Sequence, residues 1–427
     1  MPKKMGFSAV LALVFGSQIG SGIFVLPAAL APFGMFGVFG WAIAGLGAVL
    51  LAFVFAELCS KLPQTGGPHA YVRQVFGQKA GFFVGWTYWL VSWVSTSVVF
   101  IAAISSLSPF IGKNASPYEY LFWEIILLSV ITAVNCKSVE FAGKVESIFA
   151  ILKLIPFVIV PLVLFTRFDL ANISMSPQYA DVSFFKLAVI VATTSFWGFI
   201  GVECATAPAG AVRNPSKTIP RAIILGTLGV AAVYVVSSLS VMGAIPSAAL
   251  AVSKAPYVDA INLTLGENIS KLVSLVTFII MAGTSNAWTL TAAQASLGLA
   301  QNGMLPAFLA KKNKNAAPYV GVIASGVGIL PILILSTSPS LSEQISGIID
   351  FSVGVFLIVY ATCCLAFIKI SFDSRKILKV ILGIIAFLFC LIIIINSSVE
   401  STIVSLLFIA SGILVMPFAK FSKEKKA

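Results

Sequence analysis

Residues 16–22 read Gly16-Ser17-Gln18-Ile19-Gly20-Ser21-Gly22, and they interrupt an apolar segment that runs from Phe7 to Ala31. That segment is long enough to cross a membrane as a helix. Glycine costs a helix interior roughly 1 kcal/mol relative to alanine, so two glycines within three residues favour unwinding. An unwound backbone is tolerated in a membrane only where protein or a water-filled cavity pairs its N–H and C=O groups. The stretch therefore predicts a broken first span. The alternative is an intact helix whose small residues Gly16 and Gly20 pack against a neighbour.

Composition places the chain among polytopic membrane proteins. Hydrophobic residues form 59% of the 427 positions, charged residues form 10%, and the mean hydropathy is +1.03. We predict an all-α membrane protein with twelve transmembrane helices. Their ranges are about 7–31, 37–57, 81–107, 119–135, 145–166, 183–207, 221–243, 269–297, 318–336, 346–368, 379–396 and 401–419. The basic start resembles that of a signal peptide, but the long apolar run ends in no clean cleavage site, so we expect a retained first span.

The positive charge follows membrane topology. Of the 27 Lys and Arg residues, 21 lie in segments on one side when the spans alternate in direction. The positive-inside rule makes that side the cytoplasm and places both termini there, which an even number of spans requires. We therefore interpret the net charge of +12 as a topological signal rather than a nucleic-acid-binding surface. We expect a multi-pass protein of the cell's inner membrane.

Side chains suited to catalysis or metal binding are scarce. The one histidine, His69, lies in a polar loop beside Gly66-Gly67-Pro68. The six cysteines show no metal-ligand spacing, and most lie in or beside spans. The sequence shows no Ser/His/Asp set and no Cys/His pair. We predict no enzyme activity, no metal and no cofactor.

The sixth span contains a second interruption, Ser195-Phe196-Trp197-Gly198-Phe199-Ile200-Gly201-Val202-Glu203. Glycines flank the aromatic and aliphatic residues, and we interpret Glu203 as the only carboxylate deep in any span. Such a carboxylate has a functional role or clamps freed backbone groups, and the two roles are compatible.

The first and sixth spans enter the membrane in opposite directions, so their breaks indicate two inverted halves. Paired broken helices are the best sequence indication of a transporter's midplane site. We predict one transmembrane domain over residues 1–419, with repeat one at about 7–166, repeat two at about 183–368 and extra helices at about 379–419. Residues 420–427 form a short basic tail. The last two spans are rich in Ile and Leu, which suits contact with membrane lipid or a homodimer interface.

The fifth span contains Lys153 about 12 Å from its inner end, at 1.5 Å per residue. A lysine this deep costs several kcal/mol unless it is paired, hydrated or neutral, so we treat it as a functional candidate. The alternative is a side chain that extends back to the inner surface.

Four stretches also carry a resemblance to a known family. They are Gly20-Ser21-Gly22-Ile23-Phe24-Val25-Leu26-Pro27, Trp197-Gly198-Phe199-Ile200-Gly201-Val202-Glu203, Arg213-Asn214-Pro215 and Ala287-Trp288-Thr289. Together they resemble the amino acid–polyamine–organocation transporters, and most of all the basic amino acid/polyamine antiporters. The resemblance implies a LeuT-type inverted repeat of five plus five helices, two extra helices, and alternating access.

By this resemblance, the N–H groups of Gly20, Ser21 and Gly22 hold a substrate carboxylate. The carbonyls from Trp197 to Ile200, Phe199 included, take the α-amino group, while Trp197 gates the site and Trp288 lines the side-chain pocket. Helix N-termini attract anions and exposed carbonyls attract cations, which agrees with these roles. The resemblance also assigns to the substrate site Ser17, Ile19 and Thr96.

This chain departs from those antiporters at two positions, because Ser17 and Thr96 stand where they have asparagines. Lys153 also differs, since it resembles the fifth-span lysine of related amino acid transporters, which is thought to substitute for a sodium ion. We expect its ammonium to contact the unwound carbonyls near Ile19 and Gly20 and the polar stretch from Thr284 to Asn286, as a fixed tie. Glu203 joins Lys153 and Trp197 as a coupling or gating candidate.

Three functions remain open. An exchanger of amino acids or their decarboxylated amines comes first. A proton-coupled amino acid symporter of the same fold is favoured only by Lys153, and a channel or a membrane nutrient sensor fits paired broken helices poorly.

Cysteine labelling tests the predicted topology. In a Cys-free background, single cysteines at positions 66 and 313 should react with impermeant reagents only from the cytoplasm, and those at 114 and 254 only from outside. Labelling of position 114 from the cytoplasmic side contradicts the orientation.

Overall fold

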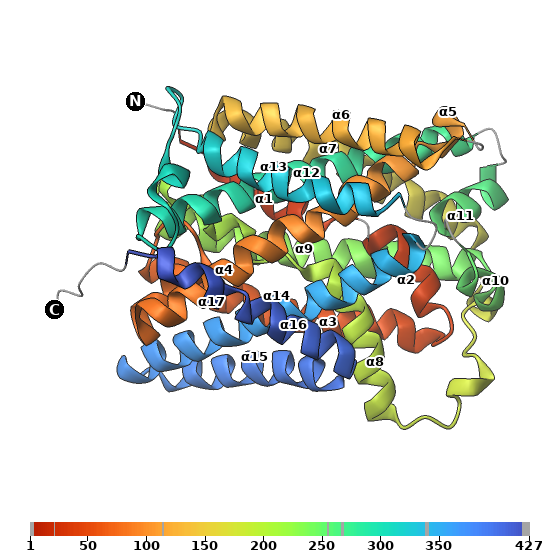
Figure 1. Ribbon diagram of the computed structural model, residues 1–427. Helices are drawn as coiled ribbons and strands as arrows, with labels where there is room; N and C mark the ends of the chain where they lie inside the picture. The colour runs from red at the N-terminus through yellow and green to blue at the C-terminus, as the bar shows by residue number, and fades with distance from the viewer. Residues whose placement is uncertain are drawn as a thin grey trace.

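Figure 1 shows the computed structural model, which describes residues 4–20, 22–112, 115–253, 256–265, 269–337 and 341–420. Over these ranges the chain forms a bundle of long helices and no β-strand, with only two isolated bridges. The α-helices are α1 (Phe7–Gln18), α2 (Gly22–Leu30), α3 (Met35–Lys61), α4 (Pro68–Ser105), α5 (Ser108–Ile111), α6 (Pro117–Lys137), α7 (Val139–Leu164), α8 (Phe184–Phe196), α9 (Pro215–Ala244), α10 (Ser247–Ala251), α11 (Pro256–Leu265), α12 (Ser270–Gln301), α13 (Tyr319–Leu335), α14 (Leu341–Asp373), α15 (Ile377–Asn396), α16 (Val399–Ala410) and α17 (Gly412–Val415). The 3₁₀ turns that matter below are η4 (Trp197–Phe199), η5 (Cys204–Thr206) and η6 (Ala209–Ala211).

Ten helical segments of the described chain are long and apolar enough to cross a membrane. This confirms an all-α polytopic membrane protein. The other two predicted spans are shorter: α1 and α2 are separate helices, and α13 has 17 residues. Twelve spans and the repeat boundaries stay predictions.

The first span is broken, as predicted. Helix α1 ends at Gln18, Ile19 has extended backbone angles (φ −78°, ψ 95°), and α2 begins at Gly22. Ser21 lies outside the described residues. The small residues also pack closely: Cβ atoms added at Gly16 and Gly20 would lie 1.7 Å from Glu146 Oε1 and 3.0 Å from Thr284 Cγ2. Unwinding and small-residue packing, which we treated as alternatives, therefore occur together.

The sixth span is broken over a longer stretch than predicted. Helix α8 ends at Phe196, and the 3₁₀ turns η4, η5 and η6 replace the α-helix as far as Ala211. Gly201 has φ +109°, a conformation that a residue with a side chain adopts only under strain. Pro208, farther along, has no N–H to donate to a continuing helix.

Helix α7 begins at Val139, six residues before the predicted boundary. The side chain of Ser138 caps it by accepting a hydrogen bond from the N–H of Phe141 (2.9 Å).

The expectation that Glu203 is the only carboxylate deep in a span was wrong. Glu146 is also fully buried within α7, and Glu124 is buried in α6. The charged first turns of α7, which include the Glu140–Lys144 ion pair (3.0 Å), concealed the start of the span from hydropathy.

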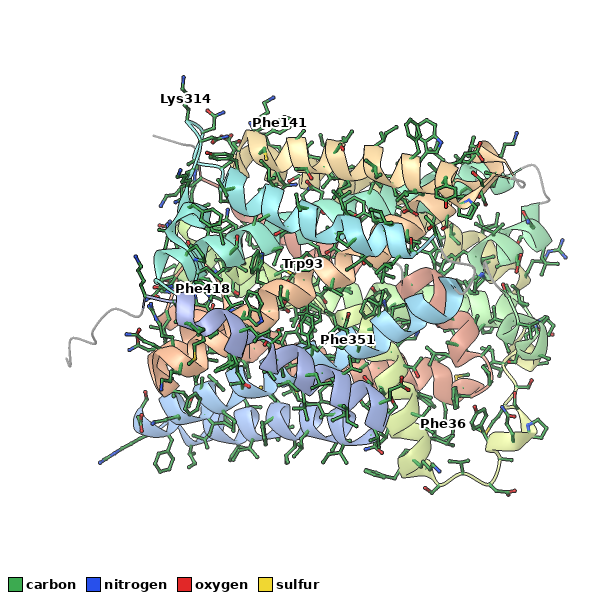
Figure 2. The ribbon with its side chains drawn as sticks, viewed as in Figure 1. Phe36, Trp93, Phe141, Lys314, Phe351 and Phe418 are labelled. Atoms are coloured by element: carbon green, nitrogen blue, oxygen red, sulfur yellow. The ribbon has the colours of Figure 1, made fainter. Side chains whose placement is uncertain are left out.

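The two broken segments lie at the centre of the bundle. Helix α1 packs against α7, α9 and α12, while α3 packs against α9 and α8. Where α3 packs on α9, the ring of Trp41 stacks on that of Tyr234, with ring centroids 4.4 Å apart. The described chain ends near Lys4 and Lys420 lie at the same end of the bundle, on the left of Figure 1, where Figure 2 places Lys314.

Helices α15 and α16 lie at the periphery. Helix α15 packs mainly on α14, and α16 packs on α14 and α4. Many of their Ile, Leu and Val side chains are exposed, including Ile395 and Leu407 (70% and 67%), and Figure 2 shows side chains projecting from this edge. An apolar surface of this kind suits lipid or another copy of the chain.

Candidate substrate site

Direct hydrogen bonds hold the two helix breaks together. The Ser17 hydroxyl donates to the carbonyl of Gly201 (3.1 Å), and the hydroxyl of Tyr234 on α9 reaches the carbonyls of Gln18 (2.6 Å) and Gly198 (3.0 Å). Tyr234 is fully buried. One phenol therefore pairs a freed carbonyl from each break.

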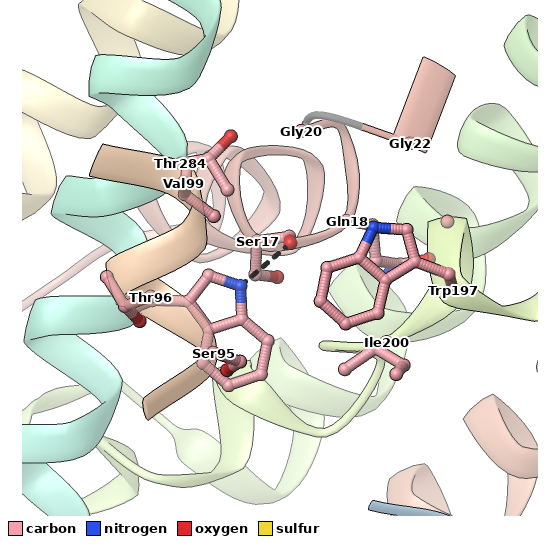
Figure 3. Close-up of a pocket in the computed structure, with 12 residues that line it drawn as sticks. Ser17, Gln18, Gly20, Gly22, Ser95, Thr96, Val99, Trp197, Ile200 and Thr284 are labelled. Atoms are coloured by element: carbon pink, nitrogen blue, oxygen red, sulfur yellow. Dashed lines mark hydrogen bonds between the residues drawn. The ribbon is translucent and has the colours of Figure 1, made fainter. Parts of the chain in front are cut away.

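A cavity of about 30 Å³ lies between the breaks, as Figure 3 shows. A cavity this small admits an amino acid only if its walls move. None of the described residues in its wall is charged. They are Ser17, Gln18, Gly20, Gly22, Ser95, Thr96, Val99, Trp197, Gly198, Ile200, Thr284 and Trp288.

Seven of the predicted substrate-binding residues meet in this wall, and they come from four separate segments. They are Ser17, Gly20, Gly22, Thr96, Trp197, Ile200 and Trp288. Gly198, which lies within the predicted carbonyl stretch 197–200, is also in the wall. Sequence reasoning assigned no binding role to Gln18, Ser95 or Val99. Gln18 adjoins the first break, which was the available signal. Ser95 and Val99 lie on α4 beside Thr96.

Two predicted residues lie behind the wall. Phe199 is fully buried and packs edge-on against Trp41 and Tyr234. Ile19 is also buried, and its carbonyl accepts hydrogen bonds from Thr284 (2.7 Å) and Lys153 (3.3 Å). Both therefore support the breaks from behind the cavity.

The two tryptophans of the wall make different contacts. The indole N–H of Trp288 donates to the carbonyl of Ser17 (3.1 Å), and its ring lies 5.2 Å from that of Phe356. Trp197 begins η4, and its Cδ1 lies 3.1 Å from where a Cβ on Gly22 would be. Glycine at position 22 therefore lets Trp197 approach the start of α2.

Lys153 contacts two of the predicted groups, the Ile19 carbonyl and the Thr284 hydroxyl, and also the carbonyl of Gly16, which was not predicted. It is 1% exposed, and its ammonium donates to the carbonyls of Gly16 (3.0 Å) and Ile19 (3.3 Å) and to the Thr284 hydroxyl (2.9 Å). The side chain therefore does not extend back to the inner surface. It ties α7 to the first break and to α12.

Glu146 is the charged residue that the sequence analysis missed. Its Oε1 lies 4.0 Å from the Lys153 ammonium, and its Oε2 accepts a hydrogen bond from Asn286 (2.8 Å). Asn286 in turn accepts one from Asn135 on α6 (3.0 Å). The spacing of seven residues between Glu146 and Lys153, two turns on one helix face, was the signal available.

Glu203 contacts two tyrosines. Its carboxylate accepts hydrogen bonds from the hydroxyl of Tyr88 on α4 (2.8 Å) and from that of Tyr360 on α14. Tyr360 also accepts one from the Gly201 N–H (3.2 Å). The clamp that we considered therefore reaches the freed backbone through Tyr360.

Comparison with known proteins agrees with this architecture. The sequence profile of the amino acid permease family matches residues 5–418, so the chain belongs to the amino acid permease family, whose members are membrane transport proteins. It is 29% identical to the cadaverine/lysine antiporter of Escherichia coli (strain K12), over all of this chain and 96% of that protein. It is also 28% identical to a putative arginine/ornithine antiporter of Bacillus subtilis (strain 168), over all of this chain and 99% of that protein. A putrescine transporter of Haemophilus influenzae is 29% identical over 84% of this chain and 82% of its own length.

Removal of the Tyr234 hydroxyl tests how the breaks are held together. Tyr234→Phe leaves two buried carbonyls without that donor, so we expect the free energy of unfolding to fall by about 1–3 kcal/mol. Thermal denaturation of the purified protein in detergent measures this loss. Tyr118→Phe, at a tyrosine that is 74% exposed, is the control and should change stability by less than about 0.5 kcal/mol. Equal melting temperatures for both variants would contradict the assignment.

Proposed function

We propose that the protein is a secondary active transporter that exchanges amino acids or their decarboxylated amines across the membrane by alternating access. The observation that carries this proposal is the small cavity between two adjacent broken helices. Broken helices around a midplane site are typical of transporters that rock about that site. The antiporters among the relatives support exchange as the mode of transport.

The finer architecture belongs to the same proposal. Helices α1 and α2 together count as the first of twelve spans, and α13 as the ninth. The first ten spans form two inverted repeats, and the excess of Lys and Arg in the segments on one side supports a cytoplasmic location for both termini of an inner-membrane protein. The exposed apolar faces of α15 and α16 support contact with lipid or a homodimer partner.

The assignment of roles follows the chemistry of the wall. The N-terminus of α2 at Gly22 supports binding of a substrate carboxylate, because free N–H groups at a helix start attract anions. The backbone carbonyls of residues 197–200 are assigned to the substrate amino group. The indoles of Trp197 and Trp288 present aromatic faces that cover an ammonium or an aliphatic stem.

Counterflow in proteoliposomes tests the proposal. Purified protein is reconstituted, and uptake of a panel of radiolabelled amino acids and amines is measured with and without the same unlabelled compound inside. Exchange requires the internal compound. Absence of counterflow for the whole panel contradicts the proposal.

The tryptophans provide a site-specific prediction. Trp197→Ala and Trp288→Ala each remove an aromatic face worth roughly 1–2 kcal/mol of cation–π attraction, so exchange should fall by about 5- to 30-fold. Initial rates in proteoliposomes measure this, and size-exclusion chromatography shows whether each variant stays folded. Wild-type kinetics in both variants would refute the assignment of the site.

Lys153 is the observation that favours the second candidate, a proton-coupled symporter. If its ammonium stays protonated as a fixed tie, Lys153→Ala should weaken substrate affinity or slow turnover and leave the exchange stoichiometry unchanged. The measurement is uptake into empty liposomes under an imposed inward proton gradient. Concentrative uptake by the wild type that is lost in Lys153→Ala would refute the tie and establish symport.

A further inference from the structure

The site is flanked by one buried pair of opposite charges. Glu146 and Lys153 are 0% and 1% exposed, and their charged atoms lie 4.0 Å apart. The other described groups that hold them are uncharged: backbone carbonyls and the Thr284 hydroxyl around Lys153, and the Asn286 amide beside Glu146. Each charge therefore has the other as its nearest countercharge.

The ammonium lies one hydrogen bond behind the cavity wall. It donates to the hydroxyl of Thr284, and the side chain of Thr284 also contacts Gly20; both residues line the cavity. Charges interact strongly across a protein interior because its dielectric constant is low. A lone ammonium at this position would repel a positively charged substrate and favour one with no net charge.

The Glu146 carboxylate is held where it offsets that ammonium. Asn286 donates to Oε2, while Oε1 has no hydrogen-bond partner and occupies the space beside Gly16 that a side chain would fill. Oε1 is the oxygen nearest to Lys153. Its principal favourable interaction is thus the charge of the lysine.

We propose that Glu146 is a specificity-determining residue. Its charge cancels that of Lys153, so the site accepts a cationic amine as well as a zwitterionic amino acid. This inference rests on the proposed function and names its substrate class: compounds with a net positive charge. Glu146 sets the local electrostatic potential and makes no contact with the substrate.

Two single variants should shift selectivity in opposite directions. The measured quantity is the ratio of kcat/KM for a cationic substrate to that for a zwitterionic one, from exchange in proteoliposomes. Glu146→Gln keeps the shape and leaves Lys153 uncompensated, so the ratio should fall roughly tenfold. Lys153→Met leaves the carboxylate uncompensated, so the ratio should rise by a similar factor even though overall turnover is slower.

The double variant Glu146→Gln/Lys153→Met carries neither charge and should return the ratio to within about twofold of the wild type. It also remains informative if one single variant fails to fold, because neither member of this pair is left as an unpaired buried charge. The matched control is Glu140→Gln/Lys144→Met, which removes a partly exposed ion pair from the same helix and should not change the ratio.

A shift of both single variants in the same direction, or equal losses for both substrates, would show a purely structural role and overturn the inference. A wild type that exchanges only zwitterionic amino acids also overturns it and leaves the proposed function intact. A wild type that exchanges nothing refutes the proposed function itself.

Discussion

Backbone groups freed within a membrane must find partners inside the protein, and this requirement organises the centre of the molecule. The first break exposes the carbonyls of Gly16, Ser17, Gln18 and Ile19. Side chains from three different helices pair with them: Lys153 from α7, Tyr234 from α9, and Trp288 and Thr284 from α12. The break therefore exists because the surrounding helices supply donors, and those helices are in turn positioned by it.

The same contacts link the two breaks. Tyr234 and Ser17 join the first break to the backbone of Gly198 and Gly201, and Tyr360 connects Gly201 to Glu203. A displacement of one break changes the hydrogen bonding of the other. This connection gives the proposed alternating access a physical basis, since a substrate that contacts both walls acts on one connected polar network.

A buried lysine would be an expensive donor by itself. Glu146 reduces that cost, and Gly16 makes room for the carboxylate by having no side chain. Gly16 on α1 and Glu146 and Lys153 on α7 therefore form one unit. In the sequence each has a simple local explanation, as a helix-weakening glycine, an acid near a helix start and a deep lysine. In the role proposed for Glu146, the charge balance of this unit affects which substrates the cavity admits.

The sequence by itself determined the class of the protein, because composition and span length depend on hydrophobicity alone. It also determined both breaks and the depth of Lys153, since glycine content and helical rise are local properties. Only the tertiary structure decided that the second break extends to Ala211, that Glu146 is buried, and that Phe199 and Ile19 lie behind the cavity rather than in its wall. The physical reason is that burial and pairing depend on helices far apart in the sequence, such as α7, α9 and α12, which meet only when the bundle packs.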